Sequence, residues 1–138
     1  MTDLLSAERR SENMRRIKSK DTRPEMVVRS LAHGMGYRYR LHRRDLPGRP
    51  DLVFPARAKV IFVHGCFWHG HPDPNCVDGR RQPKSRLDYW LPKLAGNKQR
   101  DHSHEATLRT LGWSVMIIWE CETRDTATLR ERLQAFLG

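Results

Sequence analysis

The segment from Cys66 to Cys76 carries side chains suited to binding a transition metal. It holds two thiols and two imidazoles, His69 and His71, within eleven residues, and a third thiol, Cys121, follows a strongly apolar run. Structural zinc takes four nitrogen or sulfur ligands in a tetrahedron, so three Cys and one His complete the set. His71 is the better fourth ligand, because it lies five residues from each of the nearby Cys. This spacing predicts a structural zinc site.

A less specific interpretation stays open, in which Cys121 is a core thiol and the two imidazoles are ordinary polar groups of a loop. The stretch 64–85 has no apolar periodicity, and a loop without its own core gains most from a metal cross-link. An odd count of three Cys, together with a first segment that shows no secretory signal, argues against a disulfide scaffold.

A second site can be assembled around Asp51, which follows Pro50 at the start of a short apolar run. The next apolar run leads directly into His64, so the carboxylate can meet backbone carbonyls at one end of a sheet. Such oxygen donors suit Mg²⁺ when substrate phosphate supplies the remaining ligands. His69 could then take a proton from water, and Glu25 could reach the metal-bound waters or orient a His. Taken singly, both carboxylates are also typical of turn and helix-capping residues.

The elements that must position these groups alternate between helix and strand. Thr22 as N-cap, with Pro24 and Glu25 behind it, predicts a helix that ends near Gly34. The remaining predicted elements are strands at 37–41, 51–54 and 59–63, a helix at 86–111 that could bend at Pro92, a strand at 113–119 and a helix at 125–137. The runs 51–54 and 59–63 should pair as a hairpin, and the long helix before 113–119 predicts a parallel pair and hence a mixed sheet.

The charge distribution indicates a polyanionic partner. The chain has 138 residues and a net charge of +10, and residues 9–49 alone hold 13 basic and 4 acidic side chains. A basic surface on a small domain favours nucleic acid, although charge alone gives no information on catalysis. No apolar run approaches a membrane span, so we expect no membrane partner and a cytoplasmic protein. The polar, basic sequence at the start predicts a basic arm at 1–20, and the length predicts a single domain at 21–138.

Several short motifs occur in a recognisable order. They are Asn13-Met-Arg15, Lys20-Asp-Thr22, Leu46-Pro-Gly-Arg-Pro-Asp51, His64-Gly-Cys-Phe-Trp-His69, Asp88-Tyr-Trp90 and Leu111-Gly-Trp113. Together they resemble the very-short-patch-repair (Vsr) DNA mismatch endonucleases over roughly residues 9–135. The resemblance implies an α/β, restriction-endonuclease-like core, with a central mixed sheet flanked by helices and a zinc-stapled loop.

The resemblance also implies an activity and partners. Members of this family nick one strand of duplex DNA on the 5′ side of the T in a T·G mismatch, which arises when 5-methylcytosine deaminates. The expected partners are therefore T·G-mismatched double-stranded DNA, a functionally linked cytosine-5 DNA methyltransferase and other mismatch-repair proteins, with the chain acting as a monomer. The expected cofactors are catalytic Mg²⁺ and structural Zn²⁺.

Residue roles follow from the same resemblance. Asp51 would hold Mg²⁺ with the backbone carbonyl of Val63, and His69 would be the general base. The supporting catalytic residues would be Glu25, His64 and Asp101. The zinc ligands would be Cys66, His71, Cys76 and Cys121. The rings inserted beside the mismatch would be Phe67, Trp68 and Trp90, whose polar sequence surroundings predict exposure. The further DNA contacts would be Asn13, Arg15, Lys20, Arg49 and Asn97.

Three other functions remain as alternatives. The chain could be a related restriction or nicking endonuclease with another site preference, which a panel of mismatches and methylation contexts would distinguish. It could be a zinc-stabilised DNA-binding module without catalysis, although Asp51, Glu25 and His69 are all present. A basic RNA-binding domain is the least favoured, because the chain has no strands with the aromatic pattern of RNA-recognition sheets.

Overall fold

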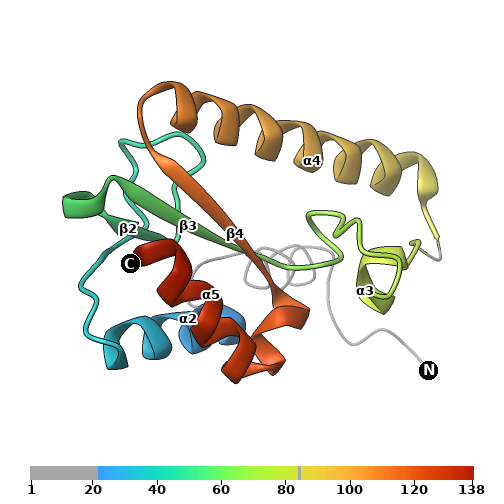
Figure 1. The fold of residues 1–138 in the computed structure, drawn as a ribbon. Helices are drawn as coiled ribbons and strands as arrows, with labels where there is room; N and C mark the ends of the chain where they lie inside the picture. Colours follow the sequence, from blue (N-terminus) through green and yellow to red (C-terminus); the bar gives the residue numbers. More distant parts are fainter. Residues whose placement is uncertain (1–21, 84) are drawn as a thin grey trace, which may run out of the picture.

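The computed structural model describes residues 22–83 and 85–138, and within them one four-stranded sheet lies between helices (Figure 1). The elements in chain order are α2 (Arg23–Gly34), β1 (Arg40–Leu41), β2 (Leu52–Phe54), the 3-10 turn η1 (Pro55–Arg57), β3 (Lys59–His64), α3 (Val77–Arg80), α4 (Leu87–Thr110), β4 (Ser114–Trp119), the 3-10 turn η2 (Glu120–Arg124) and α5 (Thr126–Leu137). Among these helices, none is both long and apolar enough to cross a membrane. The arm predicted at 1–20 lies outside the described residues.

The strand order is β1-β2-β3-β4, and the sheet is mixed as expected. β2 and β3 pair antiparallel with Leu52 opposite Ile61, which confirms the hairpin. β3 and β4 pair parallel with His64 opposite Trp119. The parallel pair is the longest in the sheet, and it follows from the long helical connection between the two strands.

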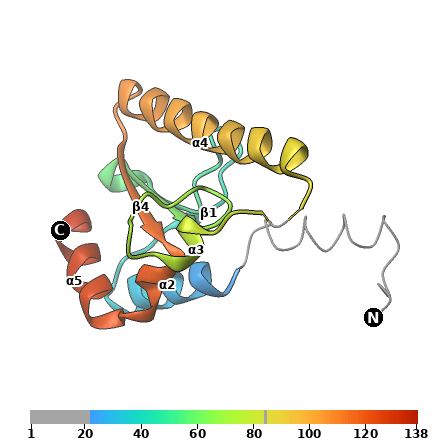
Figure 2. The same cartoon turned by 90° about the vertical axis from the view of Figure 1, so that its right-hand side faces the viewer.

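Alternating side chains divide the sheet residues between two cores. Helices α2 and α5 lie on one side of the sheet and α4 lies on the other (Figure 2). On one face, buried residues of α2 and α5 pack against the sheet in a cluster that includes Val28, Leu133 and Ile61. On the other face, Leu108 of α4 packs with Val60 and the neighbouring strand residues. The result is a three-layer arrangement in which α4 lies alone on its side of the sheet. Leu108 is the buried residue of α4 in this core.

Helix α2 begins and ends as its sequence predicts. The Thr22 hydroxyl accepts a hydrogen bond from the backbone N–H of Glu25 at 3.4 Å, and the helix ends at Gly34. The following strand is shorter than predicted, with Arg40–Leu41 in place of 37–41. The N–H of Tyr37 donates to the carbonyl of Ala32 at 3.0 Å, so the first residues of the alternating run close the helix and cannot join the sheet.

Helix α4 runs without interruption for 24 residues, and Pro92 lies inside it. The short helix α3 and the turn η2 were not predicted, because neither has an apolar period. α3 lies in the loop that carries two of the Cys, and η2 carries the third.

The attachment of α4 gives a stability prediction. Leu108 is fully buried, whereas Leu111, one turn away, is 60% exposed. Leu108→Ala should lower the free energy of unfolding by about 2–5 kcal/mol, since it leaves a cavity between α4 and the sheet. Leu111→Ala, the matched control, should change it by less than about 0.5 kcal/mol. Urea denaturation followed by circular dichroism measures both, and equal effects would contradict this packing.

Candidate functional site

A cavity of about 1020 Å³ opens beside the end of β3 and receives all the predicted catalytic side chains. Its lining includes Glu25 from α2, Asp51 before β2, His64 at the end of β3, His69 from the following loop and Asp101 from α4. Residues up to 76 positions apart in the chain therefore converge on one space. Asp51 and His69 therefore line the same space next to the end of β3.

Asp51 is held by the neighbouring strand. Its Oδ2 accepts a hydrogen bond of 2.7 Å from the backbone N–H of Val63, which comes next to last in β3. Burial, helped by the nearby negative charge of Glu25 and opposed by the Val63 N–H, raises the pKa of Asp51 to about 7. A carboxylate in such a place is stabilised by a cation, and its oxygen donors fit a hard divalent ion.

Glu25 is almost fully buried in the first turn of α2, with 2% of its surface exposed. Its Oε2 accepts hydrogen bonds from the guanidinium of Arg29, one helical turn further on, and from His42 Nε2 at 2.7 Å. His42 Nε2 also lies 3.8 Å from Oδ1 of Asp51. One donor atom from each of Glu25, His42 and Asp51 lies within 4.8 Å of the others, an arrangement that could hold a metal ion.

His69 is oriented by a carboxylate. Its Nδ1 lies 2.6 Å from Oδ2 of Asp101, and because a carboxylate only accepts, Nδ1 carries the proton in this pair. The Nε2 atom of the neutral ring then keeps a lone pair, as a general base requires. The ring of His64 stacks on that of His69 with centroids 3.9 Å apart and planes 7° apart. Position, tautomer and tilt of His69 are thus all fixed by neighbours.

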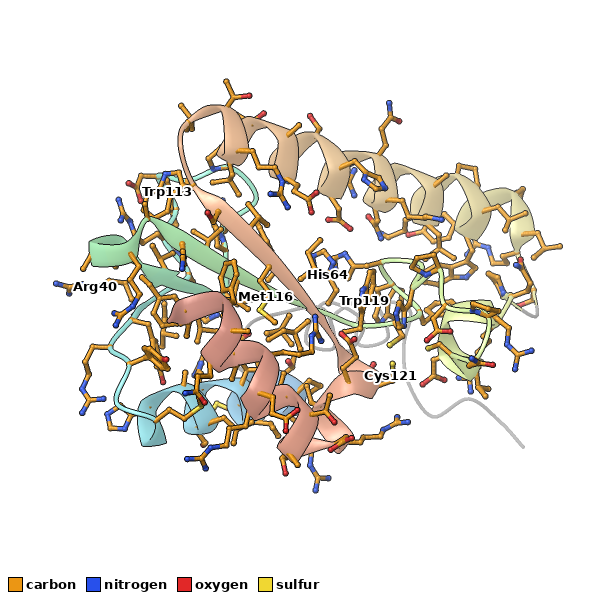
Figure 3. The ribbon with its side chains drawn as sticks, in the orientation of Figure 1. Arg40, His64, Trp113, Met116, Trp119 and Cys121 are labelled. Carbon is orange, nitrogen blue, oxygen red and sulfur yellow. The ribbon has the colours of Figure 1, made fainter. Side chains whose placement is uncertain are left out.

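His64 itself lies among other rings at the end of the parallel strand pair, next to Trp119 (Figure 3). It is 5% exposed, and its ring meets the edge of Trp119 at 5.3 Å between centroids. Its Nδ1 atom is buried with no hydrogen-bond partner among the described residues. Burial lowers the pKa of His64 to about 3, with a smaller contribution from His69. His64 therefore supports His69 as a neutral ring.

The predicted metal ligands also converge. One ligand atom from each of Cys66, His71, Cys76 and Cys121 lies within 4.8 Å of the others, so the four could hold a metal ion. His71 Nδ1 lies 3.5 Å from the sulfur of Cys121, and its ring stacks on Trp119 at 4.3 Å between centroids. The structure thus brings His71 to the cluster and His69 to the cavity, the division that the spacing predicts.

Backbone groups already point at the sulfurs of this cluster. The N–H of Cys121 donates to Cys66 Sγ at 3.4 Å, and the N–H of Gly79 in α3 donates to Cys76 Sγ at 3.3 Å. Burial raises the pKa of the Cys66 thiol, so a thiolate there needs a cation to be stable. A Cβ at Gly79 would lie 2.4 Å from the carbonyl oxygen of His71, which explains why glycine stands at this position.

The aromatic side chains between the two sites form a connected group. Phe67 meets Trp68 edge-on at 5.0 Å, and Trp68 lies 5.7 Å from Trp90 of α4, centroid to centroid. All three are partly exposed, so they are less open than predicted but still reach the surface. They line a second cavity of about 420 Å³ together with Asp78 and Arg81, among others.

The predicted DNA contacts are only partly described. Arg49 lines the large cavity, with a positive φ of 50°. Asn97 donates from its amide to the carbonyl of Trp68 at 3.1 Å and thereby holds the aromatic loop against α4. The other predicted contacts lie outside the described residues: Asn13, Arg15 and Lys20.

Two residues of the site were not found by sequence reasoning. Arg29 could have been found, because it lies four residues after Glu25 on the same helix face. His42 gives no such signal, since it follows a strand in an aperiodic loop and is 17 residues from Glu25.

Comparison with known proteins connects this site to an activity. Residues 2–75 match the family model of the DNA mismatch endonuclease Vsr. The chain is 56% identical over 137 residues to the type II nicking enzyme V.XorIIP of Xanthomonas oryzae, covering 99% of this chain and 98% of the relative. It is 42% identical over 133 residues to the type II nicking enzyme V.NmeAIP of Neisseria meningitidis, covering 96% and 92%. It is 39% identical over 142 residues to the DNA mismatch endonuclease Vsr of Escherichia coli, covering 99% and 88%.

The burial of His64 makes a prediction about its protonation. Because its folded pKa is lowered to about 3 from 6.5, the unfolded chain takes up this proton first, and His64 opposes folding increasingly as pH falls below about 6.5. Its ring resonances in NMR spectra should stay at the neutral position from about pH 8 to about pH 5. Their disappearance in His64→Asn assigns them. A midpoint between about pH 5 and 7 would contradict the burial described here.

Proposed function

Because the chain belongs to the DNA mismatch endonuclease Vsr family and is an endodeoxyribonuclease, we propose that it nicks T·G-mismatched duplex DNA. The nick falls in one strand, on the 5′ side of the mismatched T, and depends on Mg²⁺. The observation that carries the proposal is the convergence of Asp51 and the His69–Asp101 pair on one cavity. The sheet between α2, α5 and α4 fits a restriction-endonuclease-like core, which we assign to this domain.

Asp51 and the backbone carbonyl of Val63 are the groups that would hold Mg²⁺. Burial raises the pKa of the Asp51 carboxyl, which means that its ionised form is poorly stabilised there. A divalent cation beside it would stabilise that ionised form. When bound, Mg²⁺ supplies charge neutralisation at the scissile phosphate and favours ionisation of a bound water. Glu25 lies beside Asp51 and would orient such waters.

His69 takes the proton from the attacking water at Nε2. The bond from Nδ1 to Asp101 keeps the ring in the required tautomer and stabilises it once it is protonated. The stacked His64 ring keeps His69 from rotating. Because the pKa of His64 is lowered to about 3, His64 stays neutral near pH 7 and does not compete for the proton.

The aromatic group supplies the contact to the mismatch. Phe67, Trp68 and Trp90 would insert beside the T·G pair, where stacking is weaker than at a matched step. Inserting rings costs a few kcal/mol, which is offset by contacts to the kinked duplex. Arg49 and the basic arm would bind phosphate groups, in keeping with the net charge of +10.

A zinc ion is the metal that the Cys66, His71, Cys76 and Cys121 set fits best, since three thiolates and one imidazole form a closed tetrahedral site. Such a site is structural, because no position is left open for substrate. It would fix the loop that carries Phe67, Trp68 and His69.

The proposed functional partner is a cytosine-5 DNA methyltransferase, whose product generates T·G pairs on deamination. One nick requires one site, so we assign a monomer.

The names of two relatives favour a second candidate. Both are called type II nicking enzymes, which leaves a nicking enzyme with a different site preference as the alternative. The two candidates differ in the substrate, since the alternative would nick other mismatches or matched sequences.

The nicking activity is tested with end-labelled duplexes that carry each mismatch or a matched pair. Wild-type protein should nick the T·G duplex on the T strand with Mg²⁺ and not with excess chelator. Asp51→Asn should nick at least about 100-fold more slowly while still binding the duplex, because the cation loses its carboxylate. Asp45→Asn removes an exposed carboxylate that pairs with Arg43, and it serves as the matched control with unchanged activity.

Each other outcome has a definite meaning. Equal nicking of matched and T·G duplexes would reject mismatch specificity and favour the second candidate. Binding without any metal-supported nicking would leave only a DNA-binding module.

The metal cluster gives a separate prediction. Purified protein should contain one zinc per chain by elemental analysis, and His71→Ala should lose it. The free energy of unfolding should fall by about 4 kcal/mol or more, as expected when free zinc exceeds its Kd about a thousandfold. His102→Ala, which removes an exposed imidazole of α4, should keep both zinc and stability. Zinc retained in His71→Ala would contradict this ligand set.

A further inference from the structure

We propose that His42 is a positioning residue of the nuclease centre, which holds the Glu25 carboxylate against Asp51. The inference rests on the proposed function, because it assigns His42 to the metal-dependent site of that reaction. It adds a residue that neither the sequence motifs nor the expected catalytic set contains.

The side chain of His42 makes the first connection. Its Nε2 lies 2.7 Å from Oε2 of Glu25 and 3.8 Å from Oδ1 of Asp51. A carboxylate cannot donate, so Nε2 carries the proton and donates it to Glu25. The imidazole thus lies between the two carboxylates and binds one of them directly.

The backbone of His42 makes the second connection. Its N–H donates to the carbonyl of Asp51 at 3.3 Å, which extends the pairing of β1 with β2 by one residue. Its φ is 48°, a left-handed conformation that is uncommon for a residue with a side chain. Such backbone strain persists only where surrounding contacts fix it. The same residue therefore ties the start of β2 to the first turn of α2.

The burial of Glu25 makes this connection important. Its side chain is 3% exposed, and its Oε2 accepts hydrogen bonds from both Arg29 and His42. Arg29 belongs to the same helix, so it neutralises the carboxylate without fixing the distance from α2 to β2. Among the residues that the structure describes, His42 donates to this carboxylate from a different element, on the β2 side of the site. Its removal should let Glu25 turn away from Asp51, and partners of this kind typically change metal affinity 10–100-fold.

A direct metal bond from His42 is the competing assignment. The three donor atoms lie within 4.8 Å of one another, so the imidazole could be a ligand. The 2.7 Å bond to Glu25 favours positioning, because it uses the Nε2 atom that would otherwise face the cation. A glutamine side chain distinguishes the two roles, since its amide N–H can donate to Glu25 while its oxygen is a poor substitute for an imidazole ligand.

The experiment measures Mn²⁺ binding to the zinc-containing protein on a T·G duplex with a nuclease-resistant linkage, by the EPR signal of free Mn²⁺. His42→Ala should weaken binding about tenfold or more. His42→Gln should stay within about twofold of wild type, and so should the exposed control His102→Ala. In the Glu25→Gln background, His42→Ala should add no further loss, because His42 acts through Glu25. Thermal unfolding of each variant confirms that it is folded.

The nicking assay adds a kinetic readout. His42→Ala should raise the Mg²⁺ concentration needed for half-maximal rate while changing the rate at saturating Mg²⁺ much less. A folded His42→Ala protein with wild-type Mn²⁺ affinity overturns the inference and leaves the proposed function intact. Loss in His42→Gln equal to that in His42→Ala also overturns it, in favour of direct ligation. Wild-type protein that binds no Mn²⁺ rejects the proposed function, and this inference with it.

Discussion

The parallel pairing of β3 with β4 is the constraint on which both sites depend. The register places His64 opposite Trp119, where both strands end, and the chain reaches a Cys two residues after each of them, Cys66 after β3 and Cys121 after β4. The strand pairing therefore brings together Cys66 and Cys121, the two cluster thiols that are farthest apart in the chain. The same strand offers the N–H of Val63 to the Asp51 carboxylate from its opposite edge. The six-residue strand β3 thus positions both Asp51 and the Cys/His cluster.

The loop between the two sites is fixed by its own turns as well as by its ends. The N–H of His69 donates to the carbonyl of Gly65 at 3.1 Å, and that of His71 donates to Cys66 at 2.9 Å. A metal at the Cys/His cluster would therefore clamp residues that are already tightly coiled, so little entropy remains to be lost on binding. Rigidity matters for the proposed insertion of Phe67 and Trp68 beside the mismatch, because rings that shift easily would not hold the base stack open. The Asn97 bond to Trp68 supplies the same rigidity from α4.

Sequence reasoning was most successful where a local signal determines the structure. The start of α2 follows from Thr22 and Pro24, and the hairpin follows from two apolar runs separated by a short turn. The convergence of Cys66, His71, Cys76 and Cys121 could be predicted from donor chemistry, because few residue types bind a transition metal and four of them lie at compatible spacing. The catalytic set came from motif resemblance, and its convergence on one cavity agrees with that origin.

His42 shows why the rest could not be predicted. Its role depends on a left-handed backbone at the end of β1 and on the separation between α2 and β2, and both are properties of the assembled fold. No periodicity marks it, and a histidine after a strand is usually an ordinary polar residue. The shortened β1 has a related cause, since Tyr37 closes α2 in place of entering the sheet. That closure determines where the chain leaves the helix, and hence where His42 arrives beside Glu25. The hydrogen bond from the Tyr37 N–H to Ala32, which the alternating sequence does not reveal, therefore helps to place His42 beside Glu25 and Asp51.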